Sequence, residues 1–134
     1  MAMMHTVFYR DDQGHEPVDE FIDRLRPVEA QVAIDHQIDR LNMLRTTDPP
    51  LAFPHSSQIE GELRELRCHY GRRLVRVLYR RSGNLFVLLH AFEKRSRLVS
   101  EEDKAVARAR WGDFRARMDA QPRRPPRAAG HDAP

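Results

Sequence analysis

The alternation of apolar and polar residues predicts a small α+β domain. Stretches that alternate with a period of two are typical of strands, and apolar residues recurring every three or four positions are typical of helices. Pro27 closes one helical stretch and opens the next, and Gly71 and Gly83 mark two hairpin turns. The predicted elements are a strand over 5–10, helices over about 17–26 and 28–45, strands over about 62–70, 72–81 and 85–94, and a helix over about 100–118.

The last helix has a clear start and an apolar stripe. Ser100, followed three positions later by Asp103, resembles a capping box. The apolar stripe is formed by Ala107, Trp111, Phe114 and Met118. This spacing favours packing of Trp111 and Phe114 on a sheet over stacking on bases. The order β-α-α-β-β-β-α therefore predicts a mostly antiparallel sheet packed against two N-terminal helices and a C-terminal helix.

Composition limits the class of protein. The 134 residues fit one domain, predicted over 1–119, and the Pro-, Ala- and Arg-rich stretch 120–134 is predicted to be a disordered tail. Cys68 is the only cysteine, so no intrachain disulfide can form and a reducing cytoplasm is the expected setting. No apolar run approaches the roughly 20 residues of a membrane span, and the start does not resemble a secretory signal.

Charge is distributed very unevenly along the chain. The overall net charge is only +3. Residues 61–97, however, carry ten cations against three carboxylates, a net charge of +7, whereas residues 1–60 carry a net charge of −6. A contiguous basic third favours nucleic acid or another polyanion as partner.

The predicted turns place several of these cations side by side. If Gly71 and Arg72 form a two-residue turn, Arg67 lies directly opposite Arg76. A three-residue loop over 82–84 would then put His90 opposite Arg76, with Lys94 on the same side. This loop is preferred because it leaves the other face apolar, with Leu66, Cys68, Tyr70, Val75, Val77, Tyr79, Val87, Leu89 and Ala91. A two-residue loop would instead remove His90 from the row.

Arginines aligned across strands suit a phosphate, because each guanidinium can donate paired hydrogen bonds to phosphate oxygens. The alternatives are structural. Arg67 and Arg76 could form ion pairs with Glu65 and Glu62, and His90 could hydrogen-bond a backbone carbonyl. The other histidines show no metal-ligand spacing.

At these residues the chain resembles the phage-derived HigB-type branch of the RelE/ParE toxin superfamily of type II toxin–antitoxin systems. The resemblance covers roughly residues 5–118 and is strongest over 60–118. It is carried by Glu65-Leu66-Arg67, Gly71, Val75-Arg76-Val77-Leu78-Tyr79, Leu88-Leu89-His90-Ala91-Phe92-Glu93-Lys94-Arg95 and the Ala-rich helix over 105–117. Two departures, Arg95 for a second lysine and Val75 for an aromatic, preserve charge or bulk.

The resemblance implies a RelE-like fold and a metal-independent endoribonuclease without a cofactor. Such a toxin cuts mRNA on the translating ribosome and is neutralised by a cognate antitoxin, expected to be a helix-turn-helix protein. Carried over to this chain, Arg67 and Arg76 would stabilise charge on the phosphate, Lys94 would assist binding or proton transfer, and His90 would be the acid or base. Arg73, Arg95 and Arg97 are assigned to substrate binding, whereas Tyr79 is expected to pack in the core.

Two other classes of function stay open. One is a non-catalytic ParE-like inhibitor of a protein target such as DNA gyrase. The other is a non-toxic RNA-binding module of phage origin. The sequence does not give the codon preference, the identity of the antitoxin, the oligomeric state, the general base or whether this copy is active.

Overall fold

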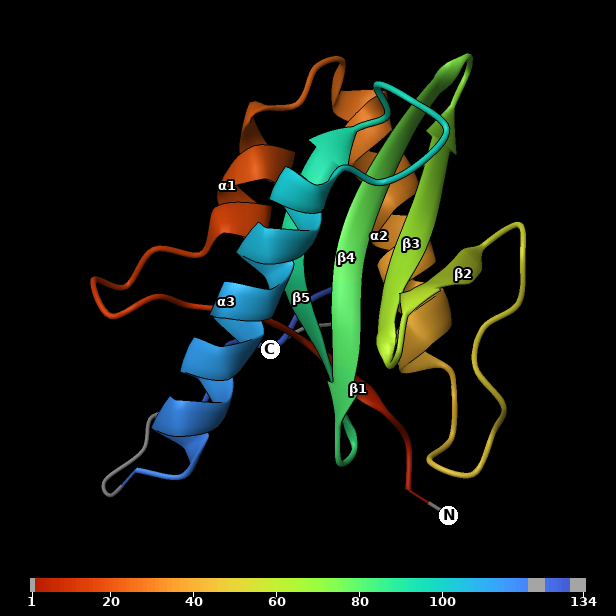
Figure 1. The fold of residues 1–134 in the computed structure, drawn as a ribbon. Helices are drawn as coiled ribbons and strands as arrows, with labels where there is room; N and C mark the ends of the chain where they lie inside the picture. Colours follow the sequence, from red (N-terminus) through yellow and green to blue (C-terminus); the bar gives the residue numbers. More distant parts are fainter. Residues whose placement is uncertain (1, 121–124, 131–134) are drawn as a thin grey trace.

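A five-stranded sheet forms the centre of the fold, with helices on both of its faces (Figure 1). The computed structural model describes residues 2–120 and 125–130. The elements are β1 (His5–Phe8), α1 (Pro17–Arg24), α2 (Val28–Asn42), β2 (Ser56–Glu60), β3 (Leu63–Tyr70), β4 (Arg73–Ser82), β5 (Leu85–Glu93) and α3 (Glu101–Met118). The predicted α+β class is confirmed.

The strand order across the sheet is β1-β5-β4-β3-β2. β1 pairs in parallel with β5, and all other neighbours are antiparallel. α1 and α2 pack against one face, and α3 packs against the other (Figure 1). This arrangement of two N-terminal helices and one C-terminal helix around a mostly antiparallel sheet agrees with the prediction and is consistent with a RelE-like fold.

The edge strand β2 was not predicted. Its sequence, Ser-Ser-Gln-Ile-Glu, has only one aliphatic residue, and only Ser56 is fully buried. An edge strand covers little of the core, so its sequence carries a weak hydrophobic pattern. β2 is fixed instead by its antiparallel pairing with β3.

The face toward α1 and α2 is the main core. Leu66 and Val77 pack there with Ile34 and Ile38 of α2 in one buried cluster. Tyr79 is also buried in this cluster, as predicted, and its hydroxyl lies 2.6 Å from Ser56 Oγ. A buried phenol hydroxyl without a hydrogen-bond partner would destabilise the fold, and Ser56 supplies that partner.

The opposite face packs against α3. Ala107 and Phe114 of the helix are buried against Leu78, and Trp111 stacks on Phe114 with ring centroids 5.8 Å apart. Ser100 caps the helix by accepting a hydrogen bond from the Asp103 N–H at 3.1 Å. The predicted cap and the packing of the predicted stripe are both confirmed.

The hairpin between β4 and β5 differs from the prediction. Ser82 pairs with Leu85, so the turn has two residues and not three, and Gly83 takes the positive φ of 60° that it requires. A β-bulge at Leu89 then inserts one extra residue into β5. As a result His90 lies opposite Leu78, and Arg76 lies opposite Phe92.

The two-residue turn also changes which residues of β5 before the bulge face each layer. Val87 and Leu89, expected on the same face as Leu66 and Val77, instead pack with α3, and Phe86 and Leu88 take their places in the main core. Beyond the bulge the alternation is restored, so His90 returns to the same face as Arg76. The predicted face of His90 is correct although its predicted partner is wrong.

The chain after α3 is not wholly a free tail. Ala128 forms an antiparallel bridge with Val7, and the N–H of Ala129 donates to the carbonyl of Thr6 at 2.7 Å. Arg127 forms ion pairs with Glu16 at 2.9 Å and with Asp19 at 2.8 Å. Residues 125–130 of the predicted tail thus include a segment that hydrogen-bonds to the edge of β1. Residues 121–124 and 131–134 lie outside the described residues.

The side chain of Asn42 in α2 links this terminal segment to β1. Its Oδ1 accepts from the Thr6 N–H at 2.7 Å, and its Nδ2 donates to the Ala129 carbonyl at 2.9 Å. Asn42→Ala leaves both backbone groups unpaired and should lower the free energy of unfolding by about 1–3 kcal/mol in urea titration. His36→Ala, on the exposed side of the same helix, should change it by less than about 0.5 kcal/mol. Equal losses in the two variants would contradict the role of Asn42.

Candidate functional site

Two arginines meet at a buried carboxylate on the sheet face that also carries α3. Arg67 of β3 lies directly opposite Arg76 of β4, as predicted. Glu65, two residues before Arg67 in β3, points to the same side and is only 4% exposed. Its carboxylate lies 3.1 Å from Arg76 Nε and 3.3 Å from an Arg67 Nη atom, and it accepts a hydrogen bond from Ser57 Oγ at 2.5 Å.

Glu65 explains how two like charges can face each other across a strand pair. Directly opposed cations destabilise a sheet, and a buried guanidinium without a partner would cost several kcal/mol, roughly. One carboxylate between the arginines offsets both effects. The ion pairs that the sequence left open as an alternative are therefore present at Glu65, whereas Glu62 pairs with Arg80 at 2.9 Å.

The side chain of Arg76 is more buried than expected for a cation that binds a ligand. Its side chain is 4% exposed, and one Nη atom donates to the carbonyl of Arg97 at 2.8 Å. This bond ties β4 to the loop between β5 and α3. Arg67 is less covered, and its guanidinium lies over the ring of Phe53 with Cζ 5.0 Å from the ring centroid.

His90 is engaged at both ring nitrogens. Nε2 lies 2.7 Å from Asp103 Oδ1 and Nδ1 lies 3.4 Å from an Arg110 Nη atom. The arginine can only donate, so this geometry assigns the proton to Nε2 in a neutral ring. Burial lowers the pKa of His90, with the charge of Arg110 acting in the same direction and the hydrogen bond to Asp103 opposing it.

The carboxylate of Asp103, at the start of α3, accepts hydrogen bonds from several side chains. Arg95 donates to its Oδ2 at 2.7 Å and Ser100 Oγ does so at 2.9 Å. Burial acts to raise the pKa of the Asp103 carboxyl, but the hydrogen bonds from His90 and Ser100 and the nearby charges outweigh burial, so its pKa is lowered. His90 is thereby positioned by a carboxylate and not by the backbone carbonyl considered from the sequence.

The remaining predicted cations lie at the end of β5 and in the loop that follows. Lys94 is exposed, and its side chain forms no ion pair or hydrogen bond with any residue that the structure describes. Arg95 and Arg97 are also exposed on this loop. Arg73 stands apart, because it pairs with Glu93 and donates to the carbonyl of Arg26 at 2.6 Å.

Comparison with known proteins identifies the family. The model of the family described as "Phage derived protein Gp49-like (DUF891)" matches residues 20–112, more than two thirds of the chain and all of the predicted site residues. The chain belongs to the phage-derived Gp49-like family. This is a family of RelE/HigB-like toxins of toxin–antitoxin systems, which implies an antitoxin as partner. No curated protein matches the chain.

The Gp49-like chain has site residues that the sequence alone did not single out. Glu65 was noted only as a possible partner of the arginines, and Ser57 and Phe53 were not considered. The position of Glu65 two residues from Arg67 could have revealed it, because residues i and i+2 of a strand share a face. Phe53 lies between two prolines in an irregular loop, where no periodic signal exists.

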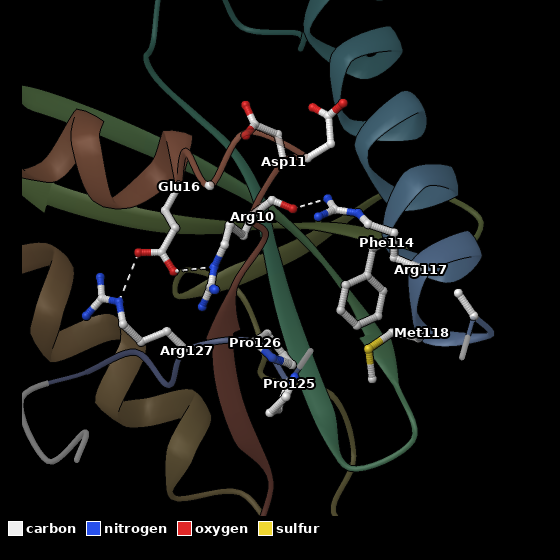
Figure 2. A pocket seen from close by; sticks show the side chains of 12 residues that line it. Arg10, Asp11, Glu16, Phe114, Arg117, Met118, Pro125, Pro126 and Arg127 are labelled. Atoms are coloured by element: carbon white, nitrogen blue, oxygen red, sulfur yellow. Dashed lines mark hydrogen bonds and ion pairs between the residues drawn. The ribbon is translucent and has the colours of Figure 1, made fainter. Parts of the chain in front are cut away.

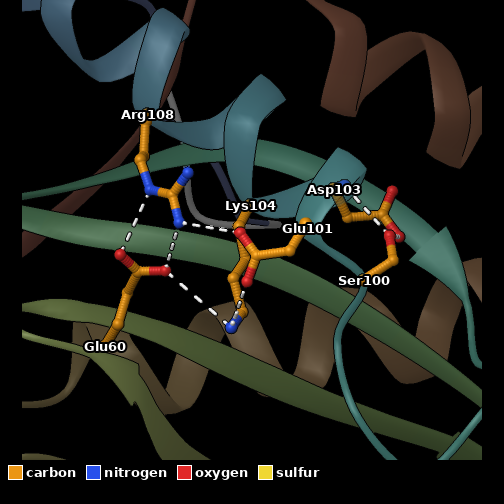
Figure 3. Close-up of polar contacts among 6 residues, drawn as sticks. All are labelled: Glu60, Ser100, Glu101, Asp103, Lys104 and Arg108. Atoms are coloured by element: carbon orange, nitrogen blue, oxygen red, sulfur yellow. Dashed lines mark hydrogen bonds and ion pairs between the residues drawn. The ribbon is translucent and has the colours of Figure 1, made fainter.

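A second polar cluster joins α3 to the edge of the sheet near this site (Figure 3). Arg108 donates to both oxygens of Glu60 in β2, at 2.7 and 3.1 Å, and Lys104 pairs with Glu101 at 3.3 Å. The hydrogen bonds from Arg108 hold the pKa of Glu60 below its usual range. These contacts help to fix the first turns of α3, which carry Asp103.

The chain also has a cavity of about 580 Å³ that none of the predicted site residues lines (Figure 2). It lies between the loop after β1, the end of α3 and the segment after Pro125. Its arginines are paired internally: Arg10 and Arg127 with Glu16, and Arg117 with Asp113. Ala120 and Pro125, which also line it, flank a stretch of the chain that lies outside the described residues, and we assign the cavity no function.

No helix within the described residues is both long and apolar enough to cross a membrane. α3, the longest helix of that part of the chain, carries charged residues along its whole length.

Removal of the buried carboxylate should be costly. Glu65→Gln leaves the Arg76 guanidinium buried without a counter-charge, and we expect the free energy of unfolding to fall by about 3–5 kcal/mol. The exposed pair of Glu62 and Arg80 provides a matched control, because Glu62→Gln should cost no more than about 1 kcal/mol. Urea titration of both variants measures the difference. A cost for Glu65→Gln no larger than that of the control would contradict the account of the cluster.

His90 should make stability depend on pH in a defined direction. Its folded pKa is held below the usual 6.5, so the unfolded chain takes up a proton at a higher pH than the folded protein. The contribution of the neutral His90 ring to stability should therefore be fully present above pH 6.5, the usual pKa, and should be lost as the pH falls below it. His90→Gln keeps a donor for Asp103 without a titrating ring, and urea titrations from about pH 7.5 to 5 should show a shallower slope. His69→Gln, at an exposed position, should keep the original slope; a slope unchanged in His90→Gln would refute the assignment.

Proposed function

We propose that this Gp49-like chain is the toxin of a type II toxin–antitoxin system and an endoribonuclease of the HigB type that cuts mRNA on the ribosome. The family supports the toxin class. The observation that supports nuclease chemistry is the meeting of Arg67 and Arg76 at Glu65, next to a loop with exposed cations. Arginine forks from two neighbouring strands can bind one phosphate from two directions.

The proposed reaction needs no atom beyond those of RNA and the protein. The ribose 2′-oxygen attacks the adjacent phosphorus as its proton passes to a base, and the bond to the 5′-oxygen breaks as that oxygen takes up a proton from an acid. Negative charge on the non-bridging oxygens rises in the transition state. Fixed cations near these oxygens stabilise that charge.

The residues have distinct roles in this proposal. Arg67 and Arg76 stabilise the charge on the phosphate, and Glu65 positions them without touching substrate. Lys94, which is exposed and has no partner among the described residues, binds the substrate or transfers a proton. His90 is the proposed acid or base. Its bond to Asp103 fixes the ring, and burial, which lowers its pKa, favours the neutral form.

The loop between β5 and α3 supports binding to a polyanion. Arg95 and Arg97 lie on it and are exposed, as expected for contacts with phosphates of mRNA or ribosomal RNA. Arg73 is assigned to the same contacts. Exposed cations add affinity without sequence preference, so these arginines are proposed for binding and not for the chemical step.

Lys94→Ala provides the cleanest test, because it removes no ion pair or hydrogen bond with any described residue. Expression of the wild-type chain should arrest growth and produce cuts in ribosome-associated mRNA, mapped by primer extension. Lys94→Ala should reduce cleavage by about 10²-fold or more and relieve the arrest with an unchanged melting temperature. Arg40→Ala, which removes an exposed cation on α2 at the opposite face of the sheet, should leave toxicity intact.

The same experiment separates the other functions. Growth arrest with intact transcripts and blocked DNA supercoiling would favour an inhibitor of gyrase and contradict the nuclease. Harmless expression of the folded chain, tested without antitoxin, would favour a non-toxic RNA-binding module. We further propose that the antitoxin is a helix-turn-helix protein whose co-expression abolishes the arrest.

A further inference from the structure

Among the residues that the structure describes, Phe53 is the only exposed Phe, Tyr or Trp, and it lies beside the candidate site. It is 69% exposed, in the loop between α2 and β2. The other Phe, Tyr and Trp side chains in the described part of the chain are buried or half-buried. Single exposed apolar side chains are common, so the position of this ring beside a cluster of charged side chains, and not its exposure alone, makes it a candidate ligand contact.

Hydrogen bonds anchor the backbone of the loop that carries this ring. Arg64 donates to the carbonyl of Leu51 at 2.9 Å, and the N–H of Arg67 donates to the carbonyl of His55 at 2.8 Å. The carbonyl of Ala52 accepts from the N–H of His55 at 3.0 Å. Bonds on both sides of Phe53 thus anchor the loop to β3, so little ordering remains to be done when a ligand binds.

The ring is also coupled directly to the proposed phosphate site. The Arg67 guanidinium lies over it, 5.0 Å from Cζ to the ring centroid, and the same guanidinium pairs with Glu65 at 3.3 Å. The cation covers only part of the ring, since most of Phe53 stays open to solvent. A flat apolar surface therefore adjoins a cation that is suited to a phosphate.

We propose that Phe53 is a base-stacking subsite for an unpaired nucleotide of the RNA substrate. The proposal rests on the function proposed above and adds a contact that recognises a base and not the backbone. In a single strand, a base and its flanking phosphate are joined by one ribose, so a strand whose phosphate contacts Arg67 can lay a neighbouring base on the ring. Aromatic stacking accepts any base, because each has a π-face.

The test compares two forms of one short single strand. A fluorescently labelled 2′-O-methyl RNA decamer cannot be cut through its 2′-oxygen, and its abasic counterpart has the same phosphates without bases. Fluorescence anisotropy gives the dissociation constants of the purified full chain for both. Wild type should bind the decamer more tightly than the abasic strand.

The variants separate stacking from general apolar contact. Phe53→Ala and Phe53→Leu should each weaken binding of the decamer by about ten-fold, because both lose the flat ring. Binding of the abasic strand should not change. Phe53→Trp, which keeps a flat aromatic ring, should bind the decamer with the affinity of wild type. Met43→Ala, which removes a 72% exposed apolar side chain at the end of α2, should bind both strands as wild type does.

Three outcomes would overturn the stacking proposal. These are unchanged decamer binding in Phe53→Ala, an equal loss for both strands, or a wild-type chain that does not bind the decamer. A fourth would be loss of antitoxin binding in Phe53→Ala with unchanged RNA binding, which would make the ring a protein contact. Cleavage of mRNA on ribosomes by the wild-type chain is measured in parallel, and its presence would keep the proposed nuclease function standing when stacking fails.

Discussion

The buried carboxylate of Glu65 is the interaction on which the candidate site depends. It joins three strands, because Ser57 belongs to β2, Glu65 to β3 and Arg76 to β4. Arg76 in turn reaches the loop after β5 through the Arg97 carbonyl. Burying an ion pair adds little net stability, since desolvation offsets attraction. Its effect here is geometric: it fixes the place at which the strands and the loop present their cations.

The sequence predicted the parts of the fold that repeat a pattern. The three helices, the strands β3 to β5 and the pairing of Arg67 with Arg76 follow from periodicity and one turn. The second hairpin could not be resolved in this way, because a two-residue turn with a bulge at Leu89 and a three-residue loop place His90 on the same face. β2 and the docking of 125–130 were missed because backbone hydrogen bonds, and not apolar side chains, define them.

The same limit applies to the site. Strand alternation was enough to bring Arg67 and Arg76 together, and it could have added Glu65. Strand alternation could not reveal that Asp103 forms a hydrogen bond with His90, because that contact depends on how α3 packs across the sheet. Nor could it predict that Arg95 shares the same carboxylate. Contacts within one sheet follow from register, whereas contacts between layers require the tertiary structure.

The pairing of these cations has a consequence for recognition. Arg67 and Arg76 pair with Glu65, Arg95 with Asp103, and Arg73 with Glu93. A phosphate that binds at one of these arginines must compete with an internal carboxylate, so each such contact gives less affinity than a free cation would. The paired arginines thus add less affinity for a polyanion than Lys94, which is exposed and has no partner among the described residues. A contact that does not involve charge, such as the proposed aromatic subsite beside Arg67, adds affinity without this competition.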